Sequence, residues 1–190
     1  GRLRSTLQDA DGVAALTQYR YDALDRVTQV LDPNGKSTTY LYNGFGELTT
    51  QQSPDTGQTV FAYDPAGNLQ SKTDARGITT TYGHDLLNRL TSVSYPDSSR
   101  NVTYSYDLAS TECYWGEKFA KGRLTRVVDA SGATDYCYDR YGNVSRKLQM
   151  TQGRTYVLRY HHTDPQGRLP GQDYLVINPP PGNQMIGMTY

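Results

Sequence analysis

The residues of this 190-residue chain that could do chemistry are its histidines, cysteines and aspartates. His161 and His162 are adjacent, so on a strand they would point to opposite faces, which is poor geometry for a shared metal ion. His84 occupies a place where neighbouring segments have a tyrosine. The sequence has no set of three or four ligands at short spacing, no glycine-rich phosphate loop and no nucleophile elbow. It therefore predicts no metal site, no cofactor and no enzymatic activity.

The aspartates are frequent, but they recur with a fixed period, which is typical of repeat proteins. The period is set by anchor positions, nearly all tyrosine, spaced by 21, 21, 21, 22, 32 and 22 residues: Tyr21, Tyr42, Tyr63, His84, Tyr106, Tyr138 and Tyr160. An aspartate or asparagine follows each of the first six anchors. Aspartates at such places organise turns and cap backbone groups, so no acid–base pair can be selected from them.

Each repeat is predicted to be a β-hairpin. Four residues after an anchor comes a residue that tolerates a left-handed backbone, and an apolar residue stands two positions further on, as in Gly67 and Leu69. A second turn, such as Asp74–Gly77, lies in the middle of the repeat. The segments between the turns are rich in Thr, Val and Tyr, which fit a pleated surface. The fold class is therefore all-β, built from tandem hairpins.

The strand that ends each repeat carries aromatic residues two positions apart, such as Tyr40 and Tyr42. Side chains two apart on a strand share a face, so stacked repeats would form an aromatic ladder along one face of a long sheet. The phenol oxygens need a partner or water at the edge of that layer. Most of the 17 tyrosines are thus predicted to be structural.

The long interval between Tyr106 and Tyr138 contains an insertion near residues 109–121. The plain interpretation is a loop that packs over the sheet. The functional one is a contact loop, with Tyr114, Trp115 and Phe119 as candidate contact residues. We expect about seven repeats over residues 1–169 and an irregular, Pro-rich tail over residues 170–190, since proline donates no ladder hydrogen bond. The alternative is that this tail forms the end of the strip, with residues 185–190 returning as a strand.

Two cysteines, Cys113 in the insertion and Cys137 between two anchor-strand tyrosines, are too few for a disulfide framework. The sequence favours two free thiols. It leaves open a bridge that fixes the insertion to the sheet, if the compartment is oxidising.

The composition excludes several classes of protein. The formal net charge is zero and no basic stripe appears, which argues against nucleic-acid binding. No run of 18 apolar residues is present, so no membrane span is predicted. An apolar content of 36% is low for one large core and suits thin, stacked sheets. A propeller is a weaker alternative, because seven hairpins would give three and a half blades, too few to close.

The segments Tyr63–Leu69, Tyr138–Val144 and Gly122–Thr125 resemble the YD repeats of bacterial Rhs proteins, which also occur in wall-associated proteins, toxin-complex components and teneurins. The resemblance extends from Gly1 to about Leu169, and the bacterial Rhs type is the most similar. It implies a long, curved or spiralling antiparallel strip that forms a shell around a C-terminal toxin. The segment Asp164–Leu169 matches the family's self-cleavage region only in part, because Arg168 interrupts it and the usual glycine pair is missing. No protease residues are therefore assigned.

Two functions follow as expectations. The first is a structural wall segment of a secreted or cell-surface bacterial toxin. Its partners would be the remaining repeats and the C-terminal effector of the same parent protein. The second is an adhesion or carbohydrate-binding module that contacts a glycan or cell-surface receptor through exposed tyrosines and Trp115. Burial of Tyr40, Tyr42, Tyr63 and Tyr104 between repeats would weaken the second. Because the chain begins in mid-repeat, we expect it to be a segment of a longer protein.

Overall fold

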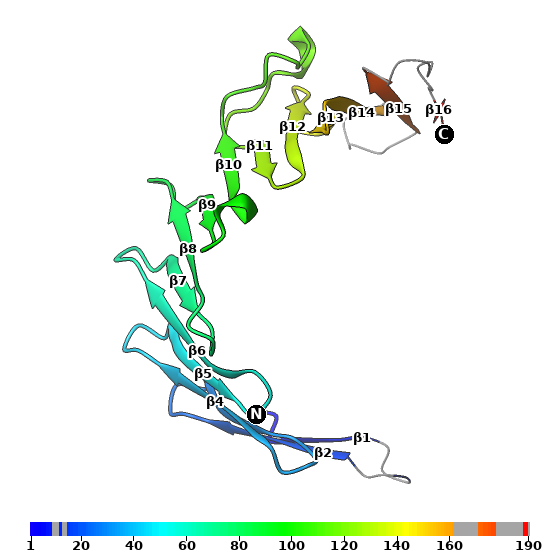
Figure 1. Ribbon diagram of the computed structural model, residues 1–190. Helices are drawn as coiled ribbons and strands as arrows, with labels where there is room; N and C mark the ends of the chain where they lie inside the picture. Colours follow the sequence, from blue (N-terminus) through cyan, green and yellow to red (C-terminus); the bar gives the residue numbers. More distant parts are fainter. Residues whose placement is uncertain (9–11, 13–14, 162–170, 178–187, 190) are drawn as a thin grey trace. The chain divides into compact units, whose positions relative to one another are not determined.

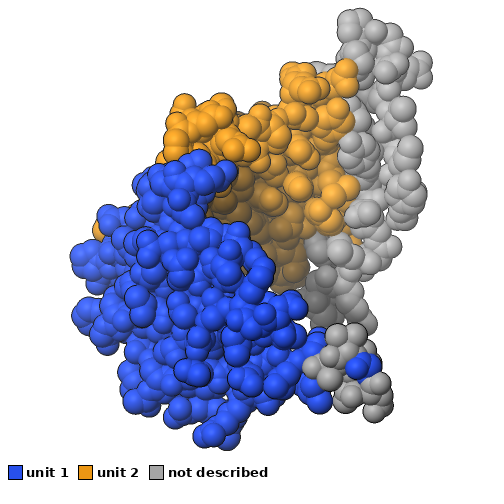
Figure 2. Space-filling model, turned by 60° about the horizontal axis from the view of Figure 1, so that its bottom comes forward, with its two compact units in different colours: residues 1–82 blue, residues 83–190 orange. Residues whose placement is uncertain are grey.

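The computed structural model describes residues 1–8, 12, 15–161, 171–177 and 188–189. This part of the chain is all-β: it consists of strands, turns and two short 3₁₀ helices, and it contains no α-helix. Residues 1–82 and residues 83–190 form two compact units, coloured separately in Figure 2 and called unit 1 and unit 2 below. The strip predicted over residues 1–169 extends over both units.

Unit 1 is an antiparallel meander in which each strand pairs with the next one along the chain (Figure 1). Its strands are β1 (Ser5–Gln8), β2 (Ala15–Tyr21), β3 (Val27–Leu31), β4 (Ser37–Tyr42), β5 (Leu48–Ser53), β6 (Gly57–Tyr63), β7 (Leu69–Thr73) and β8 (Thr79–His84). The last two residues of β8 fall in unit 2.

Unit 2 continues with the same consecutive antiparallel pairing. Its further elements are β9 (Leu90–Ser94), η1 (Ser98–Arg100), β10 (Val102–Tyr106), η2 (Trp115–Glu117), β11 (Leu124–Asp129), β12 (Gly132–Tyr138), β13 (Val144–Thr151), β14 (Arg154–His161), β15 (Gly171–Ile177) and β16 (Met188–Thr189). Strand β15 lies within the predicted tail and pairs with β14 along its whole length. The segments 162–170 and 178–187, which include the proline run and the partial self-cleavage match, lie outside the described residues.

The strands show the predicted period of two. In β2 and β6, half-buried and exposed residues alternate along the strand, with the tyrosines on the half-buried face. The described residues of unit 1 include no fully buried side chain. In unit 2, Cys113, Cys137, Leu148 and Val157 form a small buried cluster. Because so few side chains are fully buried, hydrogen bonds between successive repeats contribute much of what specifies this fold.

Candidate functional site

The aspartate after each anchor organises a tight turn. At the turn after Tyr63, Asp64 Oδ1 accepts the backbone N–H groups of Ala66 and Asn68, both at 2.9 Å. The Gly67 N–H donates to the Asp64 carbonyl at 3.0 Å, and Gly67 has a φ of 83°, where a Cβ is strained. The same two-donor pattern recurs at Asp22, Asn43, Asp85 and Asp139. The left-handed position is Asp25, Gly46, Asn88 and Gly142 in those turns, as the sequence predicted.

These hydrogen bonds hold the aspartates in their charged form. The backbone N–H of Arg89, followed by its guanidinium, holds the pKa of Asp85 below its usual value despite partial burial. The guanidinium of Arg76 does the same for the pKa of Asp74, and that of Arg89 for the pKa of Asp107. The turns therefore prefer ionised aspartates.

We expect the free energy of unfolding to fall as the pH drops below about 4. The reference pKa of these carboxyls is 3.8 and the folded values lie lower, so the unfolded chain takes up protons first. The stabilisation of the folded state by these carboxylates is complete above about pH 3.8 and is lost as the pH falls through their folded-state pKa values. Urea unfolding followed by circular dichroism across the acid range measures this. A free energy that stays constant through the acid range would contradict the assigned turn role.

The anchor tyrosines join successive hairpins through what we call the tyrosine staple: the phenol O–H donates to the backbone carbonyl of the apolar residue that directly follows the turn of the preceding repeat. The staples are Tyr21 to Leu3 at 2.6 Å, Tyr42 to Val27 at 2.9 Å, Tyr63 to Leu48 at 3.0 Å, Tyr106 to Leu90 at 2.8 Å and Tyr138 to Leu124 at 2.6 Å. Burial raises the pKa of Tyr63, Tyr106 and Tyr138. Each staple satisfies a partly buried hydroxyl and fixes one hairpin to its predecessor.

The two other predicted anchors are His84 and Tyr160. His84 ends β8 and is half-buried, and its imidazole lacks the phenol hydroxyl that donates in a staple. Tyr160 lies half-buried in β14, opposite Gln172 of β15.

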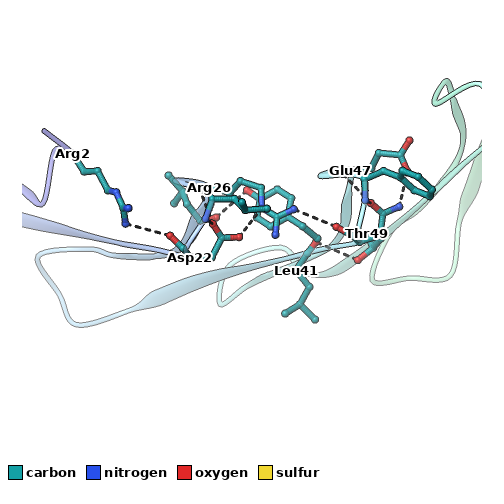
Figure 3. Close-up of polar contacts among 11 residues, drawn as sticks. Arg2, Asp22, Arg26, Leu41, Glu47 and Thr49 are labelled. Carbon is teal, nitrogen blue, oxygen red and sulfur yellow. Dashed lines mark hydrogen bonds and ion pairs between the residues drawn. The ribbon is translucent and has the colours of Figure 1, made fainter.

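A β-bulge lies opposite the five stapled tyrosines, and the sequence did not reveal it. The register skips one residue on the partner strand: Thr28, Thr49, Gln70, Thr125 and Ser145. The hydroxyl of Thr49 donates to the Leu41 carbonyl at 3.2 Å (Figure 3), and that of Thr125 donates to the Ser105 carbonyl at 3.0 Å. A signal was present in the sequence, because Thr or Ser follows the apolar turn residue in most repeats. Bulges of this kind re-aim a side chain and increase the local twist.

Arginine guanidinium groups lie over several anchor rings, a position we call the guanidinium slot. The residue before the apolar turn residue supplies the cation: Arg2 over Tyr21 at 5.9 Å, Arg26 over Tyr42 at 4.7 Å, Arg89 over Tyr106 at 4.3 Å and Arg123 over Tyr138 at 5.7 Å. Arg26 also pairs with Asp22 at 2.6 Å and donates to the Asn43 carbonyl at 3.2 Å, so it ties its own turn to the next one (Figure 3). Sequence reasoning missed this role.

The insertion is fixed to the sheet by a Cys113–Cys137 disulfide. The interpretation as two free thiols is therefore wrong. Sequence spacing could not show that the insertion folds back to bring the two Cα atoms within 5.6 Å. Both cysteines are almost completely buried, at 3% and 0% exposed, and they form part of the small core with Leu148 and Val157.

Arg146 supports the insertion from below. Its side chain is 3% exposed, pairs with Glu117 at 2.8 Å, and donates to the Glu112 carbonyl at 3.2 Å. The guanidinium lies 3.5 Å from the centroid of the Tyr114 ring. A charged group at this depth is retained only with such partners.

The predicted contact residues protrude from this supported loop. Trp115 is 93% exposed, and Tyr114 and Phe119 are about half exposed. The hydroxyl of Tyr114 also accepts a long hydrogen bond from Arg159, at 3.4 Å. The loop thus holds an aromatic side chain in solvent on a rigid base, and its role in contact stays a prediction.

The described residues contain no group of three or more histidine, cysteine and acidic side chains placed to hold a metal ion. Within the same part of the chain, no helix is both long and apolar enough to cross a membrane.

Consecutive antiparallel hairpins, joined by staples at a repeated Tyr-Asp turn, define a β-hairpin repeat scaffold. The family model described as RHS Repeat matches residues 1–37, 21–58 and 63–100. The chain belongs to the RHS repeat family. No curated protein matches it.

The fold is similar to that of large solved chains. The structure titled TcdB2-TccC3 without hypervariable C-terminal region aligns with a TM-score of 0.64 and 15% identity over 91% of this chain and 9% of its own. TcdB2-TccC3-Cdc42 aligns with a TM-score of 0.65 and 15% identity, over 97% of this chain and 11% of its own. TcdB2-TccC3 aligns with a TM-score of 0.63 and 15% identity, over 91% of this chain and 10% of its own. The chain thus spans about a tenth of the length of these proteins.

Proposed function

We propose that this chain is a wall segment of a repeat shell that encloses a C-terminal toxin or effector of the same polypeptide. The tyrosine staple carries the proposal. It joins each hairpin to the one before it through a side-chain-to-backbone bond, so a wall can be extended without a thick core. Such a wall is a non-enzymatic scaffold, and its partners are further repeats and the enclosed region.

Two observations support the proposal. One of the structures similar in fold is TcdB2-TccC3 without its hypervariable C-terminal region, so that protein has a variable region after its shared part. The Cys113–Cys137 disulfide suits an oxidising compartment, which agrees with export of the parent protein.

The second expected function, a carbohydrate-binding or adhesion module, loses its main support. The four tyrosines proposed as sugar platforms, Tyr40, Tyr42, Tyr63 and Tyr104, are half-buried, and the phenols of Tyr42 and Tyr63 are occupied by staples. Among the described residues, the exposed Trp115 still offers an aromatic platform for a glycan or receptor contact.

Limited proteolysis of the intact natural polypeptide, read by mass spectrometry, tests enclosure. We expect the region after the repeats to resist protease in the wild type. It should be cut at least about tenfold faster in the double variant Tyr63→Ala and Tyr138→Ala, because the protease reaches the enclosed region only when the wall opens. Tyr141→Ala, on an exposed turn, is the matched control and should leave protection unchanged. If the region is cut as fast as when it is expressed alone, the proposal is overturned.

A further inference from the structure

The guanidinium slot over Tyr63 differs from the slots of the other stapled repeats. The residue that supplies the arginine elsewhere is Glu47 here, directly before Leu48, the staple acceptor of Tyr63. Arg26 and Glu47 are labelled at these corresponding places of successive turns in Figure 3. Over residues 1–8 and 15–161, no arginine or lysine covers the Tyr63 ring. This repeat therefore lacks its own cation and has an anion in its place.

Glu47 has no cationic partner among the described side chains. One carboxylate oxygen accepts the Asn43 side-chain amide at 2.5 Å, and the Glu47 backbone N–H donates to Asn43 Oδ1 at 3.0 Å. These bonds orient the carboxylate but do not neutralise it. Its charge adds to burial in raising the pKa of Tyr63, so it lies near the phenol.

A cavity of about 510 Å³ opens at this slot, between the Asn43–Glu47 turn and the Asp64–Gly67 turn. Phe45 and Pro65 supply apolar lining, and Glu47 and Tyr63 supply the charged and aromatic groups. Gly67 lines it as well, and a Cβ there would lie 3.2 Å from Glu47 Oε1. The volume falls within the range of small-ligand pockets, roughly 300–1,000 Å³.

We propose that this cavity, formed by the Tyr63 ring and the Glu47 carboxylate, binds the guanidinium of an arginine side chain presented by another protein segment. The protein itself places a guanidinium on the anchor ring in four other repeats. A guanidinium is planar, stacks on aromatic faces and donates in a fork to a carboxylate, so it fits both groups at once. The arginine from the other segment would take the place over Tyr63 that Arg26 takes over Tyr42 and Arg89 takes over Tyr106.

Titration of the full 190-residue chain with methylguanidinium, followed by amide NMR, tests the proposal. We expect saturable shifts confined to Glu47 and the Asp64–Gly67 turn. Methylammonium should bind more weakly because it lacks the planar fork. Glu47→Gln keeps the size of the side chain and removes its charge, and we expect it to weaken methylguanidinium binding about fivefold to tenfold. Glu47→Arg should abolish binding, because its own guanidinium then fills the slot.

Glu112→Gln is the matched control. It removes one exposed carboxylate of the same type in unit 2 and should leave the affinity unchanged. Three outcomes would each overturn the proposal. They are chemical shifts that do not saturate, an unchanged affinity in Glu47→Gln, and binding that is retained in Glu47→Arg. Repeating the titration on the intact natural polypeptide identifies the source of the arginine. A slot already closed to methylguanidinium indicates an arginine from the same polypeptide, and an open slot indicates a separate protein.

Discussion

Replacing Cys113 and Cys137 with alanine should lower the free energy of unfolding by about 3 kcal/mol. The disulfide links positions 24 residues apart, and closing a loop of this length removes chain entropy worth roughly 3 kcal/mol from the unfolded state. The loss should be larger if the buried cluster with Leu148 and Val157 repacks poorly around the smaller side chains. Urea unfolding monitored by circular dichroism measures it, since the exposed Trp115 is a poor fluorescence probe.

Hydrogen exchange gives this prediction a local readout. Amides of β12, which contains Cys137, and of β13, which pairs with it, should lose protection in the double variant. Those of β4 to β6 in unit 1 should not. Reduced wild-type protein is the control, because it keeps both sulfur atoms in the core and loses only the crosslink. A variant as stable as the oxidised wild type would show that the other contacts of the insertion, such as the Arg146–Glu117 ion pair, hold it without the disulfide.

Truncation of Tyr138 is the second change with a large expected effect. Tyr138 is 9% exposed and donates its staple to the Leu124 carbonyl at 2.6 Å. Tyr138→Phe should cost about 1 kcal/mol, because it removes one hydrogen bond and leaves that carbonyl without its phenol partner. Tyr138→Ala should cost about 3–5 kcal/mol, because it also removes a buried ring and opens a cavity. Thermal and urea unfolding of both variants separate the two contributions.

Tyr141 provides the control from the same turn. It is 53% exposed and makes no staple, so Tyr141→Ala should change stability by less than about 0.5 kcal/mol. Tyr63→Phe in unit 1 should repeat the cost of Tyr138→Phe, since its staple is built in the same way. If Tyr138→Phe were as stable as wild type, the phenol bond would add nothing and the aromatic ring alone would join the hairpins.

Local turn chemistry was readable from the sequence. Asp64 and Gly67 are three residues apart, and an aspartate and a glycine at that spacing have few structural roles other than forming a turn. A carboxylate that accepts two backbone N–H groups and a residue with positive φ together specify the turn. The period of two in β2 and β6 followed for the same reason, because alternation is a local property of a strand.

Features that depend on contacts between hairpins were not readable. The hydroxyl of Thr49 looks like any strand threonine until the bulge brings it to the Leu41 carbonyl. Arg26 looks like a solvated charge until the next repeat places Tyr42 beneath it. The disulfide depends on how a 24-residue excursion folds back, which no local pattern contains. These contacts lie 8 to 24 residues apart in sequence, beyond the reach of turn and strand propensities.

The direction of the staples has a consequence for how the protein is made. Each of the five staples runs from a tyrosine back to a carbonyl only 14 to 18 residues earlier, so none of them depends on a part of the chain that has not yet been synthesised. Ribosomes add roughly 5–20 residues per second, so a 21-residue repeat takes about one to four seconds to emerge. Hairpins form in microseconds. Each repeat can therefore close onto its predecessor before the next one appears, and any segment encoded after the repeats emerges beside a wall that is already assembled.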